Sequence, residues 1–363
     1  MKIILTCGGT GGHITPALAI ADIIKENFPR AEILFVGGER GMEKDMVSKA
    51  GYRIELLDVE GLSRKLTLHN FQVIKKAIGA VATAKALLKG FDPDLVIGTG
   101  GYACYPTLRA AVSLGIPCAV HESNACPGLA VKRLSGGVDR VWLNFAAAKQ
   151  GLSPKAKVRV VGNPLPRGIF EGKEKSVSPK DKRKAVLSFG GSLGADAMNR
   201  AILDLMERER EMADVYHLHA TGHRSYQAVL ADFEKRGLSQ CSRLSLVPFI
   251  EDMPSQMAAA DLVICRAGAM SISELAAIGV AAVLIPSPNV TGNHQYKNAK
   301  MLADAGAAKL IAESALDETF TMSVIALLED APQRERMAKA IATFARKDAN
   351  RQIFEDMKAL TRK

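Results

Sequence analysis

The stretch "KIILTCGGTGGH" (residues 2–13) decides how this chain begins to fold. Its first part, "KIILT", is an apolar run of the length expected for a buried β-strand. Glycines follow at once, and "TPALAIADIIKENF" (15–28) then has the apolar spacing of a helix, with Thr15 as candidate N-cap and Pro16 in the first turn. Strand, glycine-rich turn and helix in this order are typical of the first unit of a parallel, doubly wound α/β sheet.

The same design occurs twice more along the chain. "GTGGY" (98–102) and "GGSLGA" (190–195) each follow an apolar run, and "KAVLSFGGSLGADAMNRAILDLMERE" (184–209) repeats the opening architecture. Further apolar runs at strand length lie at 31–37, 94–101, 116–124, 215–222, 243–249, 261–268 and 281–288. We therefore expect two doubly wound α/β domains, with the loops at the carboxyl ends of their strands around one cleft.

Composition limits the classes of partner. The chain has 363 residues, 48% of them hydrophobic and 24% charged, as in a soluble protein of two domains. A net charge of +10 favours anionic partners, but a single Trp and 5% aromatics argue against a base-stacking nucleic-acid platform. Six scattered cysteines form no C-x-x-C pair, so we expect no zinc site, no disulfide framework and a reduced cytoplasmic location. The charged stretch 171–184 predicts an exposed loop near the domain junction.

Three glycine turns at strand ends favour phosphate or sugar binding over purely steric turns. No G-x-x-x-x-G-K-[ST] occurs, which excludes a P-loop. "GTGGYA" (98–103) formally matches a dinucleotide fingerprint, with Glu122 as its acid. "GGSLG" (190–194) formally matches a hydrolase nucleophile elbow, with Ser192, Asp261 and His294 in the order of a triad. Both alternatives stay open at this point.

Several polar side chains at predicted strand ends are suited to chemistry. His13 and, within "HESN" (121–124), Glu122 are candidate bases, and Asn124 offers a donor and an acceptor. In "CRAGAMSISELAAIG" (265–279), Ser271 or Ser273 is a candidate cap for a helix whose first turn would hold Glu274. Glu274 is then either a capping acid or a carboxylate that binds the vicinal hydroxyls of a ribose.

Two further segments have candidate contacts. "TGNHQYKNA" (291–299) supplies His294 and Gln295 for sugar hydroxyls, and the backbone of Ile250 is placed to meet a base ring. Residues 65–89 have apolar and basic side chains at helical spacing, which predicts either a packed surface helix or a helix lying on anionic lipid. The residues concerned are Phe71, Ile74, Lys75, Lys76, Ile78 and Val81.

Taken together, the motifs resemble the MurG family of UDP-N-acetylglucosamine transferases. "GGTGGH", "GTGGY", "LGIPCAVHESN", "VVGNP", "GGSLGA", "FIEDM", "CRAGAMSISE" and "NHQYKNA" follow in the family's order over nearly the whole chain. The resemblance implies a GT-B fold and an inverting, metal-independent transfer without a cofactor. The substrates would be UDP-N-acetylglucosamine (UDP-GlcNAc) and lipid I, giving lipid II for peptidoglycan, cell shape and cell division. A non-catalytic scaffold that binds the nucleotide sugar remains the third alternative.

The resemblance also implies domains and sites. Residues 1–163 would bind acceptor and membrane, 164–341 would bind UDP-GlcNAc, and a helix at about 342–363 would pack back on the first domain. The general base would be His13 or, second, Glu122, and Gly100, Gly101 and Tyr102 would face the acceptor. The donor would contact Thr10, Gly11, Gly12, Asn124, Arg167, Ser192, Ile250, Ala269, Met270, Ser271, Ile272, Ser273, Glu274, His294 and Gln295.

A last implication concerns location. The acceptor is a membrane lipid, so the resemblance favours the lipid-binding interpretation of residues 65–89. It implies peripheral attachment to anionic lipids at the cytoplasmic face of the cell membrane, contact with other cell-wall and division proteins, and no nucleic-acid partner.

Overall fold

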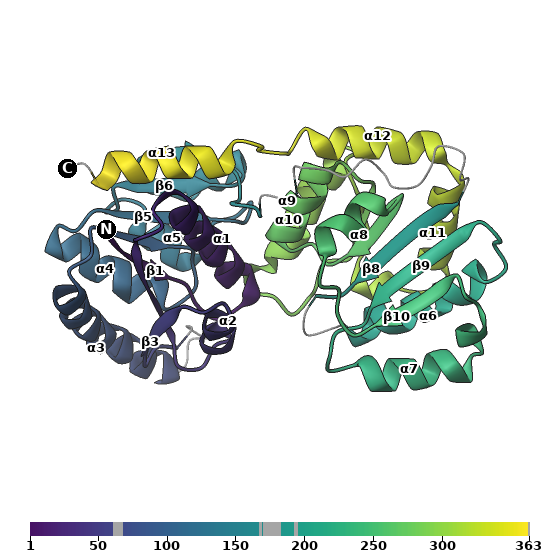
Figure 1. Cartoon of the computed structure of the whole chain (residues 1–363), viewed down its shortest axis with the longest axis horizontal. Helices are drawn as coiled ribbons and strands as arrows, with labels where there is room; N and C mark the ends of the chain where they lie inside the picture. The colour runs from purple at the N-terminus through teal and green to yellow at the C-terminus, as the bar shows by residue number, and fades with distance from the viewer. Residues whose placement is uncertain (61–67, 167–168, 170–182, 192–194, 362–363) are drawn as a thin grey trace. The chain divides into compact units, whose positions relative to one another are not determined.

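The chain folds into two compact units, each a parallel sheet covered by helices (Figure 1). The computed structural model describes all residues except 61–67, 167–168, 170–182, 192–194 and 362–363, and it leaves aside the side chains of 68–75, 77 and 291. Unit 1 consists of Met1–Pro166 and Arg346–Lys363, and unit 2 of Arg167–Ala345. The loop expected at 171–184 lies almost wholly outside the described residues.

Unit 1 has a seven-stranded parallel sheet in the order β3-β2-β1-β4-β5-β6-β7. Its strands are β1 (Lys2–Thr6), β2 (Glu32–Gly38), β3 (Arg53–Leu57), β4 (Leu95–Gly98), β5 (Cys118–Glu122), β6 (Arg140–Leu143) and β7 (Val158–Val160). Its helices are α1 (Gly11–Asn27), α2 (Glu43–Lys49), α3 (Leu68–Phe91), α4 (Cys104–Leu114), α5 (Leu129–Leu134) and α13 (Ala349–Thr361).

The apolar sequence of β1 follows from its position in the middle of this sheet. Successive side chains point to opposite faces. Ile3 and Leu5 pack in one hydrophobic cluster with Ile20 of α1, and Ile4 packs in another with Leu108 of α4. Both faces are covered, so the strand needs apolar residues at every position rather than at alternate ones.

The C-terminal helix α13 belongs to unit 1 and lies along its sheet (Figure 1). Asp356 on this helix accepts a hydrogen bond from the indole Nε1 of Trp142, at 2.8 Å, on β6. The same carboxylate pairs with Arg159 at 2.8 Å and Arg140 at 3.2 Å. These contacts attach the chain's end to strands more than 190 residues earlier in the sequence.

Unit 2 has a six-stranded parallel sheet in the order β10-β9-β8-β11-β12-β13. Its strands are β8 (Lys184–Phe189), β9 (Val215–Ala220), β10 (Leu244–Val247), β11 (Leu262–Cys265), β12 (Ala282–Leu284) and β13 (Lys309–Leu310). Its helices are α6 (Asp196–Glu209), α7 (Tyr226–Lys235), α8 (Met253–Ala259), α9 (Ala269–Ile278), α10 (His294–Asp304), α11 (Glu318–Glu329) and α12 (Ala331–Ala342).

A buried chain of polar side chains links β8, β9 and α6 within unit 2. Ser188 Oγ lies 2.6 Å from His217 Nε2 and 2.7 Å from His219 Nδ1. His217 Nδ1 lies 2.6 Å from Glu209 Oε2, and His219 Nε2 lies 3.1 Å from Asn199 Oδ1. All five side chains are almost fully buried, so their hydrogen bonds offset the cost of placing polar groups in the core.

The strand orders confirm the expected pair of doubly wound, Rossmann-like sheets. In unit 1 the order of connection reverses between β1 and β4, and in unit 2 it reverses between β8 and β11. Doubly wound sheets bind ligands beyond the carboxyl ends of the strands at this switch point. The glycine-rich stretches at 8–13, 98–102, 190–195 and 265–271 follow these four strands, so each unit has a candidate ligand site at its own switch point.

Candidate active site

The two glycine loops at the switch point of unit 1 interlock. A Cβ atom at Gly101 would overlap the carbonyl oxygen of Gly8, and one at Gly9 would lie 2.9 Å from the ring of Tyr102. Gly101 and Gly9 also have φ values of +85 and +88, which favour glycine. These glycines therefore serve the contact between the two loops, and a larger residue at either position would separate them.

His13 lies at the centre of this arrangement, in the first turn of α1. Its Nδ1 is 3.0 Å from the carbonyl oxygen of Gly8, and its own carbonyl accepts a hydrogen bond from Thr99 Oγ1 at 2.6 Å. A carbonyl oxygen only accepts, so Nδ1 must carry the hydrogen. In the neutral ring Nε2 then has the lone pair, as a general base requires.

The start of α1 differs from the expectation. The helix begins at Gly11 with Thr10 as N-cap, so the predicted N-cap at Thr15 is wrong, and Pro16 lies in the second turn. A Cβ at Gly11 would meet nothing within 4 Å, and one at Gly12 would meet only the hydroxyl of Thr10. Unlike Gly8 and Gly9, these two glycines are not needed for internal packing. They leave the helix N-terminus, with its unpaired amides and favourable field for anions, open to a ligand.

Glu43 is a buried acid beneath the first glycine loop that the sequence analysis missed. Its carboxylate accepts hydrogen bonds from the amides of Gly9, at 3.2 and 3.3 Å, and Gly38, at 2.8 Å. Gly37 and Gly41 make room for it, because a Cβ at either position would collide with the Glu43 side chain. The signal in the sequence was the group of glycines that directly precedes this acid in "GGERGME" (37–43).

Glu122 and Asn124 form a closed hydrogen-bonded turn at the end of β5. Glu122 is 3% exposed, and its Oε1 accepts from the backbone and side-chain amides of Asn124, at 3.0 and 3.1 Å. Its Oε2 accepts from the amide of Gly128 at 2.8 Å. With both oxygens occupied, the carboxylate holds the loop that presents Asn124. The geometry thus favours His13 over Glu122 as the base.

At the switch point of unit 2, the structure describes helix α9 in full, whereas residues 192–194 of the loop after β8 lie outside the described residues. It begins at Ala269 with Gly268 as N-cap and without a side-chain cap, so the predicted caps at Ser271 or Ser273 are wrong. The turn after β11 is supported from α10, where the buried Asn298 donates to the carbonyl oxygen of Ala267 at 3.4 Å. Arg167 and Ser192 lie outside the described residues.

Glu274 lies in the second turn of α9 rather than the first, which rules out the capping interpretation. Burial raises the pKa of its carboxyl to about 7. It has no hydrogen-bond or ion-pair partner among the residues that the structure describes. A desolvated carboxylate without a partner is costly unless a ligand supplies donors, and two vicinal hydroxyls would do so.

Of the remaining residues that were predicted to contact UDP-GlcNAc, some lie at the surface and others in the core. Gln295 is half-buried at the start of α10, where its Oε1 accepts from the amide of Ser287 at 2.8 Å, which orients its NH₂ group for donation. His294 precedes it, and Ile250 is 7% exposed beyond β10. Ile272 is fully buried and its amide donates to Gly268, so its side chain packs in the core. Ala269, Met270 and Ser273 are also mostly buried.

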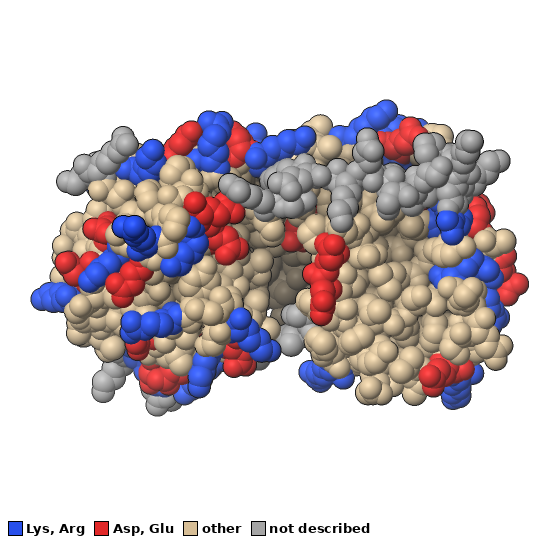
Figure 2. All heavy atoms as spheres, viewed as in Figure 1, with Lys and Arg blue, Asp and Glu red and all other residues tan. Residues whose placement is uncertain are grey.

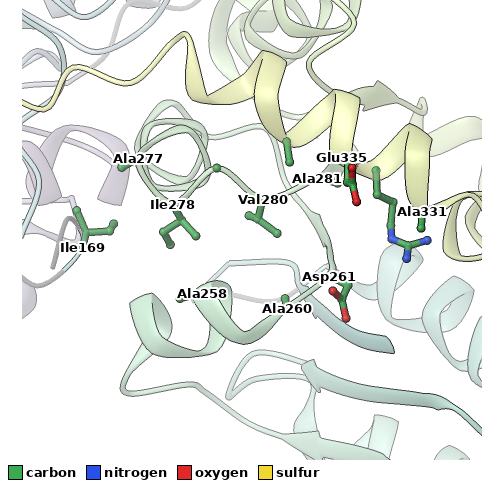
Figure 3. Close-up of a pocket in the computed structure, with 13 residues that line it drawn as sticks. Ile169, Ala258, Ala260, Asp261, Ala277, Ile278, Val280, Ala281, Ala331 and Glu335 are labelled. Carbon is green, nitrogen blue, oxygen red and sulfur yellow. The ribbon is translucent and has the colours of Figure 1, made fainter. Parts of the chain in front are cut away.

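The hydrolase alternative is contradicted by the position of Asp261. This residue precedes β11, and its carboxylate accepts from the amide of Ala185 at the beginning of β8. It therefore lies at the amino ends of the strands, whereas the glycine loop after β8 and His294 lie beyond the carboxyl ends. Asp261 instead lines a cavity of about 400 Å³, shown in Figure 3, with Ala331 and Glu335 of α12. This cavity is not the switch-point site.

The structure separates the predicted membrane residues on α3. Ile78 is 68% exposed, whereas Val81 packs against the core of unit 1. Lys76 is paired with Asp58 at 3.1 Å and Glu60 at 2.7 Å. The side chains of Phe71, Ile74 and Lys75 lie outside the described residues.

Two further properties of the structure concern contact with a membrane, namely the distribution of surface charge and the apolar character of the helices. On the face drawn in Figure 2, positive and negative side chains are intermingled over unit 1. Within the described ranges, no helix has both the length and the apolar character that crossing a membrane requires.

Comparison with known proteins matches both units to one family. The model of the glycosyltransferase family 28 N-terminal domain matches residues 3–143, and that of the C-terminal domain matches residues 185–353. Two curated relatives carry the name UDP-N-acetylglucosamine–N-acetylmuramyl-(pentapeptide) pyrophosphoryl-undecaprenol N-acetylglucosamine transferase. The protein from Acetivibrio thermocellus is 40% identical over 99% of this chain and 98% of its own. That from Leuconostoc citreum is 39% identical over 98% and 97%.

Solved structures agree with these matches. The crystal structure of Acinetobacter baumannii MurG superposes with a TM-score of 0.79, at 29% identity, and covers 99% of both chains. A UDP-GlcNAc 2-epimerase from Neisseria meningitidis superposes with a TM-score of 0.66 over 99% of this chain and all of its own. At 17% identity the epimerase shows only the shared fold.

Proposed function

We infer that this chain, which belongs to glycosyltransferase family 28, transfers N-acetylglucosamine from UDP-GlcNAc to lipid I and so forms lipid II for peptidoglycan. The observation that carries this inference is the match to transferases of that name along the whole chain. The two doubly wound units, each with its own switch-point site, fit an enzyme that binds two substrates.

We propose that unit 2 binds the donor. The vicinal hydroxyls of the ribose would donate to the Glu274 carboxylate, which otherwise lacks a described partner. Amides at the N-terminus of α9 and at Gly190–Gly191 would face the diphosphate, where the helix field favours negative charge. Gln295 and His294 would meet the sugar, and the backbone of Ile250 the uracil. By resemblance to the family, Arg167 and Ser192 would also contact the donor, and Ala269 to Ser273 would contact its nucleotide.

We propose that unit 1 binds the acceptor and supplies the base. The loop with Gly100, Gly101 and Tyr102 would face the acceptor, and the open start of α1 at Thr10, Gly11 and Gly12, with Asn124, would approach the donor sugar. These assignments rest on the position of the residues at the switch point and on the open space around Gly11 and Gly12.

The reaction would proceed by a single displacement with inversion. As the acceptor's C4 oxygen bonds to the anomeric carbon, the bond from that carbon to the UDP oxygen breaks. His13 Nε2 takes the hydroxyl proton, and the negative charge passes to the departing UDP. The transition state should resemble an oxocarbenium ion, as in glycoside hydrolysis. Amides at the donor diphosphate would stabilise the leaving group without moving during the reaction.

The test is UDP release from UDP-GlcNAc in the presence of a short-chain lipid I analogue, with UDP-GalNAc as the control donor. We expect release with UDP-GlcNAc and at least a hundredfold loss of kcat in His13→Ala, within the range that a positioned base contributes. A scaffold would bind UDP-GlcNAc and release no UDP. Near-normal kcat in His13→Ala at saturating acceptor would remove His13 as the base.

We further propose that the protein attaches peripherally to anionic lipid at the cytoplasmic face of the membrane, through α3, and meets other cell-wall proteins there. The exposed Ile78 supports this, since an apolar side chain on a helix surface can enter the headgroup region. Ile78→Glu should reduce co-sedimentation with vesicles of mixed anionic and neutral lipid. Met322→Glu, at a similarly exposed apolar residue of unit 2, is the control. Equal binding to purely neutral vesicles would contradict the anionic preference.

A further inference from the structure

One peptide group in the first glycine loop is hydrogen-bonded at both of its polar ends. The amide of Gly9 donates to the Glu43 carboxylate, at 3.2 and 3.3 Å from its two oxygens. The carbonyl oxygen of Gly8, in the same peptide group, accepts from His13 Nδ1 at 3.0 Å. A buried carboxylate and the proposed base are thus joined by a single peptide unit.

The position of Glu43 is built into the fold rather than a chance contact. It is 0% exposed although it begins helix α2, and its carboxylate accepts from Gly38 as well as Gly9. Both contacts come from donors only, which is the arrangement of an ionised carboxylate. Gly37 and Gly41 leave the space that the side chain occupies. Any larger residue there would force the carboxylate away from the loop.

We propose that Glu43 is a positioning residue for His13 and acts through the Gly8–Gly9 peptide. Its negative charge polarises the peptide, so that the Gly8 carbonyl oxygen accepts a stronger hydrogen bond from Nδ1–H of His13. This fixes the tautomer that leaves Nε2 as the base, and it stabilises the imidazolium that forms when Nε2 takes the acceptor's proton. The Asp of a Ser-His-Asp triad orients its His directly; here a peptide lies between the acid and the imidazole. The inference rests on the proposed function, since it takes His13 as the base.

The charged and titratable neighbours leave Glu43 as the group to test. Burial and then the Glu43 charge raise the pKa of Cys7, and the same two causes raise the pKa of Tyr102, so both are neutral near pH 7. Arg40, 60% exposed, is bonded to Glu60 at 2.7 Å. Burial also raises the pKa of Cys104. Glu43 is therefore the acid to test, because its carboxylate is hydrogen-bonded directly to this loop.

The proposal is tested on the full-length protein by nitrogen-15 NMR of labelled histidines, with His13 assigned by its loss in His13→Gln. In the wild type we expect the Nδ1–H tautomer. In Glu43→Gln, which keeps the volume and removes the charge, we expect the His13 titration midpoint to fall by about half to one pH unit. The acid limb of the kcat profile should move to lower pH by the same amount, and kcat on the plateau should fall about three- to tenfold as the base weakens.

Glu39→Gln removes a charge from the exposed loop just before Glu43. This control variant should leave the His13 titration midpoint and the pH profile of kcat unchanged. An Nε2–H tautomer in the wild type would overturn the proposal even if Glu43→Gln failed to fold. So would an unchanged His13 midpoint in a folded Glu43→Gln. A shifted midpoint with an unshifted kcat profile would support the link from Glu43 to His13 and would instead contradict His13 as the base.

Discussion

At the scale of single residues, the glycines of unit 1 have different purposes, and this difference can be tested. Gly101 has φ +85, and a Cβ there would overlap the Gly8 carbonyl oxygen that holds His13. We expect Gly101→Ala to lower kcat by about a hundredfold through a shift of that carbonyl. Gly115→Ala, at φ +70 with nothing within 4 Å, has similar backbone strain without the collision. It should cost about 1 kcal/mol of stability and keep kcat. Equal kcat values in the two variants would show that the interlocked loops do not position His13.

Glu274 makes a second prediction at this scale. Burial places its pKa at about 7, and the ionised carboxylate, with one oxygen for each ribose hydroxyl, accepts more strongly than the protonated carboxyl. The dissociation constant of UDP should therefore rise as pH falls below 7, by up to about tenfold per unit, since protonation competes with binding. Glu274→Gln should weaken UDP binding at pH 8 by about ten- to a hundredfold and remove the pH dependence, as measured by calorimetry.

Two controls separate a ribose contact from a general effect on the unit. Glu234→Gln, at an exposed position on α7, should bind UDP normally. The wild type should prefer UDP to 2′-deoxy-UDP, and Glu274→Gln should lose that preference. A preference that survives in the variant would place the ribose elsewhere.

Glu274 also has a consequence for stability in the absence of ligand. Its folded pKa is higher than its unfolded value, so the folded state binds the proton more tightly and stability falls as pH rises from about 4.5 to 7. Glu274→Gln should therefore melt at a higher temperature than the wild type at pH 8, by scanning calorimetry without UDP. A lower melting temperature would mean that the ionised carboxylate has a stabilising partner in the folded protein.

At the scale of elements, the sequence predicted the central strands buried on both faces and missed three of the four edge strands. The runs at 2–6 and 184–189 match β1 and β8, whose cores need apolar residues throughout. No apolar run signalled β3, β7 or β13, which are edge strands, whereas the run at 243–249 did predict the fourth edge strand, β10. An edge strand has one neighbouring strand and is partly exposed, so its residues need not be apolar. β6 is short, and was also missed.

The candidate site shows the same division. The glycine turns could be assigned to the site because each follows a predicted strand, and the carboxyl ends of parallel strands meet at one edge of the sheet. The start of α1 could not, because Gly11 and Gly12 have low helix propensity and yet take helical backbone. Glu43 was missed because its contact with Gly9 joins residues 34 positions apart, and the glycines before it do not indicate which loop the acid meets.

The buried histidines predict how the elements respond to acid. Burial lowers the pKa of His219 to about 3 and that of His121 to about 4. As pH falls below about 6.5, these histidines bind protons in the unfolded chain but remain neutral in the folded protein. The stability that they contribute is therefore complete above pH 6.5 and decreases as pH falls towards 4. Urea unfolding at pH 7, 6 and 5 should show this loss, at up to ~1.4 kcal/mol per pH unit for each histidine.

His219→Gln should reduce the slope of this pH dependence by up to one proton, whereas His223→Gln, at an exposed position, should leave it unchanged. Equal slopes in all three proteins would mean that the buried chain from Glu209 to Asn199 takes up a proton without unfolding.

At the scale of the whole molecule, the return of α13 makes unit 2 an insertion between two parts of unit 1. The chain leaves unit 1 at Pro166 and re-enters it at Arg346. Unit 1 is therefore completed only by the last residues of the chain, through Asp356 on α13. A truncation before Arg346 would remove α13 from the Trp142 face of the unit 1 sheet and leave α1 as its remaining cover, although every residue of unit 2 is present.

The single tryptophan makes the two units separately observable. Trp142 is fully buried in unit 1, and its indole donates a hydrogen bond to Asp356. Its fluorescence therefore reports the unfolding of unit 1 alone. Saturating UDP at a hundred times its dissociation constant should stabilise the unit that binds it by about 2.7 kcal/mol. If unit 2 holds the donor, UDP should raise an unfolding transition seen by far-UV circular dichroism and leave the Trp142 transition in place. Asp356→Asn should lower the Trp142 transition and keep the response to UDP. Because the two signals come from one sample, a Trp142 transition that moves with UDP as far as the dichroism does would contradict a donor site confined to unit 2.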